Sequence, residues 1–216
     1  MIIKHKDIVH WNAAPEHNLN QGCEYYMPLV SVILTSFNHG KFIGEAIESV
    51  LDQSFQDLEL IIWDDASVDD SWEKIRSYSD SRIRAFQNPK NAGPVLGVNK
   101  AIFEIAQSKY IAIHHSDDVW ELDKLQKQVE FLEDNAGIGA VFSNVQAIDE
   151  RGAPLVDTKH FYADIFSQAN RSRYEWLRHF FLSGNALCHP SILIRRQCYE
   201  DCGPYRDMLA QLPDLD

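Results

Sequence analysis

Two carboxylates stand side by side directly after an apolar run in the middle of the sequence. The run 110–115 (YIAIHH) is typical of a buried strand, and Ser116-Asp117-Asp118 closes it. A strand of an open α/β sheet ends at the edge where such folds bind ligands. Adjacent carboxylates repel each other unless a cation or a donor-rich ligand lies beside them. Because carboxylate oxygens suit Mg²⁺ or Mn²⁺, the pair predicts a divalent-metal site, with a solvated turn that caps the next helix as the alternative.

A second acidic cluster follows another buried run. The run 58–63 (LELIIW) ends at Asp64-Asp65, with Ser67 and Asp69 just beyond. The carboxyl ends of parallel strands meet at one edge of a sheet, so we expect this cluster to lie close to Asp117 and Asp118.

Strand-like and helix-like patterns alternate along most of the chain. Together they predict an α/β fold with a doubly wound, mostly parallel sheet flanked by helices. Residues 1–27 are polar and irregular and predict an N-terminal extension, which leaves one domain over 28–216. The predicted strands are 30–37, 58–63, 82–86, 110–115, 138–148 and 190–195, and the predicted helices are 42–51, 72–75, 96–106, 122–132 and 174–182.

Composition excludes several classes of protein. The net charge is −12 and no basic run occurs, which argues against nucleic-acid binding and against a polybasic membrane patch. No segment approaches the roughly 20 apolar residues of a membrane span, and the N-terminus lacks the apolar stretch of a signal peptide. Four cysteines without a second Cys/His pair at zinc spacing indicate a reducing, cytoplasmic compartment.

Two glycine-rich nucleotide motifs are missing. No strand is followed by GxGxxG, and GxxxxGK[ST] does not occur. A nucleotide would therefore have to be held by side chains and metal instead of a glycine-rich loop.

Five motifs in order resemble the family-two glycosyltransferases with the GT-A fold. They are Thr35-Ser36-Phe37-Asn38; Gln53-Ser54-Phe55; Asp64-Asp65-Ala66-Ser67 with Asp69; the strand that ends at Asp117-Asp118; and the run 189–196 (HPSILIRR) with Leu212-Pro213-Asp214. The loop and helix that carry Asn91, Gly93 and Asn99 match as well. The resemblance covers residues 28–216 and implies that this part is the catalytic domain.

This resemblance implies a donor site for a nucleotide-diphospho-sugar. Thr35 and Phe37 would line the base pocket, and Asp65 would accept the imide N–H of a uracil. Asp117 would meet the ribose and, with Asp118, the Mn²⁺ or Mg²⁺ ion that neutralises the leaving diphosphate. The other positions assigned to the nucleotide are Asn38, Ser67 and Asn99.

The resemblance also implies how the sugar is moved. Asp214 would be the general base that deprotonates an acceptor hydroxyl, and a single displacement inverts the anomeric carbon. The acceptor would be a saccharide or a lipid-linked saccharide used in polysaccharide or cell-surface glycan synthesis. Peripheral membrane association is compatible with this interpretation, since no transmembrane segment is expected.

The chain departs from the family pattern in two places. His115 stands where the family usually has an aspartate, and imidazole can bind Mn²⁺ without adding negative charge. His115 is therefore the third candidate metal ligand, whereas His114 is interpreted as a packed strand residue. The family also continues beyond the Asp214 motif, so the chain is expected to be truncated at its C-terminus.

Two other classes of protein compete with this interpretation. A metal-dependent phosphohydrolase would use His114, His115 and the acidic pairs, but a two-metal site needs further ligands at strand ends. A receiver-type binding module would place its acidic pair after the first strand and a lysine at a late strand end. The sequence offers neither.

Overall fold

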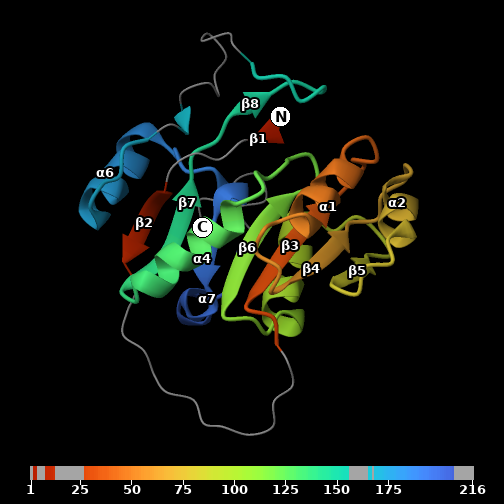
Figure 1. Ribbon diagram of the computed structural model, residues 1–216, viewed down its shortest axis with the longest axis horizontal. Helices are drawn as coiled ribbons and strands as arrows, with labels where there is room; N and C mark the ends of the chain where they lie inside the picture. Colours follow the sequence, from red (N-terminus) through yellow and green to blue (C-terminus); the bar gives the residue numbers. More distant parts are fainter. Residues whose placement is uncertain (1, 4–7, 13–26, 156–164, 167, 207–216) are drawn as a thin grey trace, which may run out of the picture.

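A seven-stranded sheet forms the centre of the computed structural model, which describes residues 2–3, 8–12, 27–155, 165–166 and 168–206 (Figure 1). The strand order is β2-β7-β9-β6-β3-β4-β5. The strands are β2 (Ile8–Asn12), β3 (Val30–Ser36), β4 (Leu58–Asp64), β5 (Ile83–Gln87), β6 (Tyr110–His115), β7 (Ile138–Ser143) and β9 (Leu193–Arg195).

Strand direction confirms the predicted α/β architecture. β6, β3, β4 and β5 form a continuous parallel block. β9 lies antiparallel between β6 and β7, so β7 points the same way as the block. Only β9 and the edge strand β2 run in the opposite direction among the described strands of this sheet, which is therefore mostly parallel.

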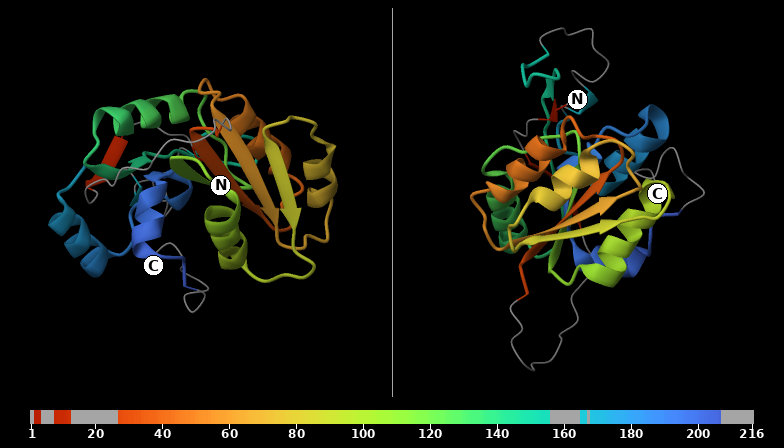
Figure 2. Two further views of the ribbon diagram at one scale, coloured as in Figure 1. Left: turned by 90° about the horizontal axis from the view of Figure 1, so that it is seen from below. Right: turned by 90° about the vertical axis from the view of Figure 1, so that its right-hand side faces the viewer.

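Helices cover both faces of the sheet. α1 and α4 pack on one face, and α3, η1 and α7 pack on the other, as the left view of Figure 2 shows. None of the described helices is long and apolar enough to cross a bilayer. The helices are α1 (Ile43–Leu51), α2 (Ser71–Ser77), α3 (Pro94–Lys100), its π-helical continuation η1 (Ala101–Ile105), α4 (Lys124–Asp134), α6 (Arg173–Ser183), the 3-10 turn η2 (His189–Ser191) and α7 (Arg196–Cys202).

The alternation of side chains along β3 explains why it lies at the centre. Val32 and Leu34 are fully buried against the α1 and α4 side, whereas Ile33 is fully buried against the α3 and α7 side. A strand that is apolar on both faces can only lie between two layers of helices. The same is true of β4 and β6, so the strand ends that carry the acidic motifs are held in a rigid core.

Four expectations need correction. The predicted strand 190–195 is shorter, because the 3-10 turn η2 occupies His189–Ser191 and β9 begins at Leu193. The N-terminal 27 residues are not wholly irregular, because β1 (Ile2–Ile3) and β2 form strands, and β2 extends the sheet through backbone bonds to β7. The predicted strand 138–148 is divided into β7 and β8 (Ala147–Ile148), which pairs with β1 instead of the central sheet. The helix α7 was not expected, since its sequence RQCYEDC lacks a clear apolar stripe.

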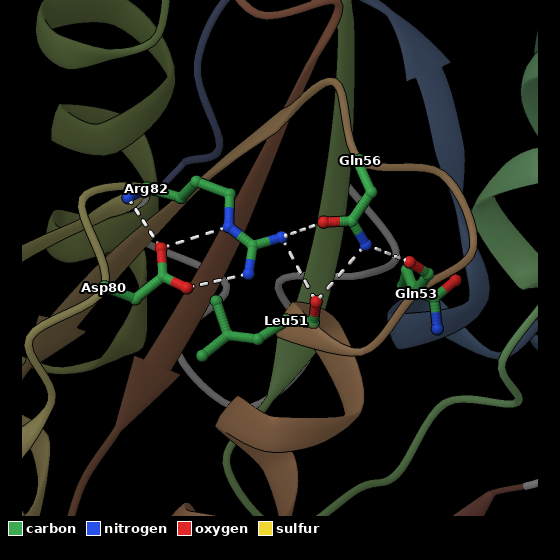
Figure 3. A network of polar contacts seen from close by, with 5 residues as sticks. All are labelled: Leu51, Gln53, Gln56, Asp80 and Arg82. Atoms are coloured by element: carbon green, nitrogen blue, oxygen red, sulfur yellow. Dashed lines mark hydrogen bonds and ion pairs between the residues drawn. The ribbon is translucent and has the colours of Figure 1, made fainter.

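An arginine joins three segments at the opposite end of the sheet from the acidic motifs (Figure 3). Arg82 donates from Nε and Nη2 to the two carboxylate oxygens of Asp80, at 3.0 and 2.7 Å. Its Nη1 donates to the carbonyl of Leu51 at 3.1 Å and to Oε1 of Gln56 at 2.8 Å. The guanidinium therefore ties the end of α1 to the turn before β5, and its hydrogen bonds lower the pKa of Asp80.

We expect Arg82→Ala to lower the free energy of unfolding by about 1–3 kcal/mol, the usual contribution of hydrogen bonds to charged groups. An aspartate whose pKa is lowered by folding stabilises the protein at pH values above the pKa of the unfolded chain. This stabilisation is lost as the pH falls through the pKa of the folded state. The difference in the free energy of unfolding between wild type and Arg82→Ala should therefore become smaller below about pH 4, and denaturant titrations at several pH values measure it. Arg84→Ala is the matched control, because Arg84 is more exposed and its pair with Glu59 should contribute less than about 1 kcal/mol.

Candidate functional site

The register of the parallel block brings the acidic motifs to one edge of the sheet, as predicted. Thr35 at the end of β3 lies opposite His115 at the end of β6. On the other side of β3, Ser36 lies opposite Asp64 at the end of β4. The loops that leave β3, β4 and β6 therefore start next to one another, and they carry most of the candidate site residues.

His115, Asp117 and Asp118 form a three-residue cluster in the loop that leaves β6. Each residue offers a ligand atom, and these atoms all lie within 4.8 Å of one another. His115 Nδ1 lies 3.7 Å from Oδ2 of Asp118. Asp117 and His115 are half-buried, so the cluster is open to a ligand on one side. One imidazole nitrogen and two carboxylates form a ligand set that suits Mn²⁺ or Mg²⁺.

Asp118 is the residue of the cluster whose charged form most needs a cation beside it. Only 4% of the residue is exposed. Burial, together with the charge of Asp117, raises the pKa of Asp118 well above its usual value. A buried carboxylate of this kind is stable in its charged form only when a positive charge lies beside it. The residues present therefore fit a divalent metal.

One further residue, His39, supports this loop and was not singled out in the sequence. His39, from the loop after β3, has its Nδ1 2.7 Å from Oγ of the buried Ser116 and 4.0 Å from Oδ1 of Asp117. The imidazole thus connects the loops that leave β3 and β6. A histidine directly after the Phe37-Asn38 pair was the available signal, but its partner lies 77 residues away.

Phe37 and Thr35, which the sequence predicts to line a base pocket, lie at the end of β3. Phe37 is 43% exposed at the end of β3, so it is not a core aromatic residue. Thr35 is half-buried beside it. An aromatic ring held at the edge of a sheet and open to solvent presents a surface on which a nucleobase can stack.

Asp65 is held in place by the loop that follows β5. Its Oδ1 accepts hydrogen bonds from Nδ2 of Asn88 at 2.7 Å and from the backbone N–H of Ala92 at 2.8 Å. Its Oδ2 accepts one from the backbone N–H of Gly93 at 2.8 Å. Two carboxylate oxygens have about four acceptor positions, so one remains for a ligand. Asp65 therefore shapes this loop in addition to any contact with a nucleotide.

Asn38 and Ser67 join two loops to each other. The backbone N–H of Asn38 donates to Oγ of Ser67 at 2.9 Å, and Oδ1 of Asn38 accepts from the backbone N–H of Val68 at 2.8 Å. Ser67 also donates to Oδ1 of Asp64 at 2.5 Å. Asn38 has φ of 54°, a left-handed conformation that asparagine tolerates better than most residues. These side chains thus position the loops around the candidate site.

Asn99 holds a segment that follows α7. Its Nδ2 donates to the carbonyl of Tyr205 at 2.9 Å, and its Oδ1 accepts from the backbone N–H of Tyr205 at 3.0 Å. The Tyr205 hydroxyl lies 3.0 Å from Nε2 of His189, whose ring centre is 5.7 Å from that of His115. The side chain of Asn99 therefore connects to the candidate metal cluster through Tyr205 and His189.

The family model described as glycosyl transferase family 2 matches residues 31–196 of this chain. That range runs from the second residue of β3 to the end of β9 and includes all the site residues placed above except Tyr205. The chain belongs to glycosyl transferase family 2.

Two curated glycosyltransferases are similar to this chain in sequence. The putative teichuronic acid biosynthesis glycosyltransferase TuaG of Bacillus subtilis is 39% identical over 132 residues, which are 60% of this chain and 52% of TuaG. The UDP-Glc:alpha-D-GlcNAc-diphosphoundecaprenol beta-1,3-glucosyltransferase WfaP of Escherichia coli is 38% identical over 107 residues, which are 50% of this chain and 42% of WfaP. The chain thus spans about half the length of these relatives.

A solved structure confirms the predicted GT-A type of fold. The mannosyltransferase PcManGT from Pyrobaculum calidifontis, in complex with GDP-Man and Mn²⁺, superposes with a TM-score of 0.60 at 20% sequence identity. The match covers 84% of this chain and 48% of that protein.

His114 and Asp214 are the remaining residues for which the sequence predicts a role. His114 is a packed strand residue, as predicted: it is fully buried with its ring centre 4.4 Å from that of Trp120, and burial lowers its pKa well below the usual value. Asp214 lies outside the described residues, so its predicted role stays a prediction.

Proposed function

We propose that this chain binds a nucleotide-diphospho-sugar and a divalent cation at the edge formed by β3, β4 and β6, and that it transfers the sugar to an acceptor hydroxyl with inversion. The observation that supports this most strongly is the buried Asp118 beside Asp117 and His115. The proposed cation site lies at the same edge of the sheet as the exposed ring of Phe37 and the carboxylate of Asp65.

The donor site follows from these positions. Phe37 stacks on the base, Thr35 contacts it from the strand end, and the free acceptor position of Asp65 receives the imide N–H of a uracil. Asn38, Ser67 and Asn99 act by positioning the loops instead of touching the nucleotide, because their side chains already bond to other loops. The UDP-sugar in the name of WfaP supports a uridine nucleotide, whereas PcManGT binds a guanosine nucleotide.

The cation would be held by Asp117, Asp118 and His115. When bound, Mn²⁺ or Mg²⁺ supplies positive charge to the phosphates and so stabilises the leaving nucleoside diphosphate. The protein residues orient the donor and keep water from one side of the carboxylates, since Asp118 and Ser116 are buried. The Mn²⁺ in the PcManGT complex supports a metal of this kind.

The acceptor is proposed to be a lipid-linked saccharide in cell-surface glycan synthesis, and the reaction is proposed to take place in the cytoplasm. The names of TuaG and WfaP, a teichuronic acid enzyme and an enzyme for a diphosphoundecaprenol acceptor, support this assignment. Asp214 is proposed as the general base for the acceptor hydroxyl.

The phosphohydrolase alternative loses support from the geometry. Within the part of the chain that the structure describes, His115, Asp117 and Asp118 are the one cluster of three candidate metal ligands. Asp64 is fully buried and accepts from Ser67 and Gln87, so it does not offer a second metal site. A receiver-type module is not a member of family 2.

A thermal-shift experiment tests the donor proposal directly. UDP, dTDP and GDP are each added with and without Mn²⁺, and stabilisation grows as RT ln(1 + [L]/Kd). We expect UDP with Mn²⁺ to raise Tm most. Equal shifts with and without the metal would contradict the cation site, and a larger shift with GDP would assign a different nucleotide.

We expect Asp65→Asn to weaken UDP binding roughly 10- to 100-fold and to lower the free energy of unfolding by about 1–3 kcal/mol. The asparagine has one acceptor oxygen and one NH₂ group. Either the N–H of Gly93 or the N–H groups of Asn88 and Ala92 would therefore point at the NH₂ group instead of an acceptor. Calorimetric titration with UDP and denaturant unfolding measure the two effects.

Asn88→Ala separates the base contact from the loop contact. It removes one donor to Asp65 and the acceptor of the Trp63 indole N–H, but it leaves the carboxylate intact. We expect a similar loss of stability with a much smaller loss of UDP affinity. If both variants lose UDP affinity equally, Asp65 acts through the loop and not on the base.

A further inference from the structure

The helix α6 presents an apolar stripe to solvent. Tyr174, Leu177, Phe181 and Leu182 are 73%, 50%, 90% and 65% exposed. Their spacing of three, four and one residues places them on one side of the helix, opposite the buried Trp176. Four large apolar side chains are therefore exposed on one side of a helix of 11 residues, and exposed apolar surface of this kind marks interaction sites.

The charge around this stripe is opposite to that of the whole chain. Residues 165–187 contain three arginines, Arg171, Arg173 and Arg178, and a single acidic residue, Glu175. The chain as a whole carries a net charge of −12. Arg173 and Arg178 are exposed. The helical spacing places Arg173 on one side of Leu177 and Phe181 and Arg178 on the other side, between Phe181 and Leu182. The sequence shows no basic run because helix formation, not adjacency in the chain, gathers these arginines beside the apolar side chains.

The position of α6 leaves the apolar stripe accessible. It lies at the outer edge of the molecule, beside β2, in Figure 1, and at the end of the molecule in the left view of Figure 2. The exposed stripe does not hold α6 in place. A capping box of Ser172 and Glu175 begins the helix, and the buried Trp176 anchors it, with Cζ of Arg171 4.7 Å from the centre of the Trp176 ring. Five residues lie between Ser183 and His189, so the helix ends within roughly 20 Å of His189, whose ring lies beside that of His115.

We propose that the exposed face of α6 docks on an anionic membrane surface, with Leu177 and Phe181 inserted among the lipid chains and Arg173 and Arg178 on the phosphates. An interfacial helix binds through apolar area together with electrostatic attraction to anionic lipids. This inference deepens the proposed function, since a lipid-linked acceptor lies in such a surface. Vesicle binding is measured without sugar transfer or nucleotide binding, so a failure of membrane docking can be told apart from a failure of the proposed function.

A second copy of the chain fits this face less well. A two-fold contact would place the same arginines against themselves, which costs free energy where an anionic lipid gains it. The helix is only about 16 Å long, and one such face provides far less than the roughly 800 Å² per partner of a stable interface.

Co-sedimentation with vesicles tests the proposal. The protein is mixed with phosphatidylglycerol vesicles or with phosphatidylcholine vesicles at low and high salt. We expect binding to the anionic vesicles that weakens with salt. The double variant Leu177→Ser with Phe181→Ser should bind at least tenfold more weakly, and Arg173→Glu or Arg178→Glu should each weaken binding by about fivefold or more on anionic vesicles. Leu122→Ser, at a leucine 62% exposed elsewhere, is the matched control and should bind as the wild type does.

Three results would overturn the membrane assignment. The wild type does not bind anionic vesicles, or the α6 double variant binds as well as the wild type. The third is a dimer in size-exclusion chromatography that the double variant abolishes without any vesicle binding by the wild type, which would assign α6 to a protein interface. All variants change exposed side chains, and circular dichroism confirms that each one is folded.

Discussion

Asp118→Asn is expected to remove metal-dependent nucleotide binding almost completely. The change keeps the size of a side chain that is 4% exposed, so the fold should persist. It removes one of two anionic ligands from a cluster whose third member, His115, is neutral when it binds a metal. Residues that only support metal ligands already contribute about 10- to 100-fold to metal affinity, so loss of a ligand should weaken Mn²⁺-dependent UDP binding by roughly 100-fold or more.

The same variant should be at least as stable as the wild type when no metal is added. The carboxylate is buried next to Asp117, and its replacement by a neutral amide removes both the burial of a charge and a like-charge pair. Thermal unfolding with and without Mn²⁺ measures this, because only the wild type should gain Tm from the ion. Asp134→Asn, at an exposed carboxylate near the end of α4, is the control. Wild-type Mn²⁺ dependence in Asp118→Asn would remove Asp118 from the metal site.

The strands and the edge of the sheet where the site lies could be predicted from the sequence. β3, β4 and β6 are within one residue of their predicted bounds, because apolar runs that are buried on both faces have few other ways to fold. Once these strands are parallel, the residues that follow them must converge. His115, Asp117 and Asp118 come together because they share the loop that leaves β6, and the parallel topology brings that loop next to the loops that leave β3 and β4.

The order of the strands and the partners of polar side chains could not be predicted. β9 has three residues and enters between β6 and β7 antiparallel, which no local pattern indicates. Asn99 bonds to Tyr205, 106 residues away, and Asn38 bonds to Val68, 30 residues away. An amide looks the same in the sequence whether it meets a nucleotide or a distant backbone, so its partner is known only from the fold.

His189 and Tyr205 show the same limit on what the sequence can predict. The run HPSILIRR was recognised as a motif, but the sequence did not show that its histidine lies beside His115 or that Tyr205 meets it. Tyr205 is held at its backbone by Asn99 and at its hydroxyl by His189. The chain therefore passes the metal cluster at Tyr205, nine residues before Asp214.

Asp214→Asn is expected to lower kcat for sugar transfer by roughly 10²- to 10⁴-fold, the usual contribution of a general base. Nine residues span at most roughly 30 Å, so a chain held at Tyr205 can bring the Asp214 carboxylate to the donor edge. Asparagine keeps the size of the side chain but cannot take the proton of an acceptor hydroxyl. Because the base acts only in the transition state, donor affinity should stay within about twofold of the wild type.

Single-turnover transfer to a lipid-linked saccharide gives the rate, and calorimetric titration with UDP and Mn²⁺ gives the donor affinity. Asp216→Asn removes a carboxylate two residues further on and should leave both unchanged. Tyr205→Ala releases the segment from His189 and should lower the transfer rate without changing UDP affinity, since Tyr205 only positions the residues after it. If Asp214→Asn transfers sugar at the wild-type rate, another group takes the proton, and His189 beside the metal cluster becomes the next residue to test.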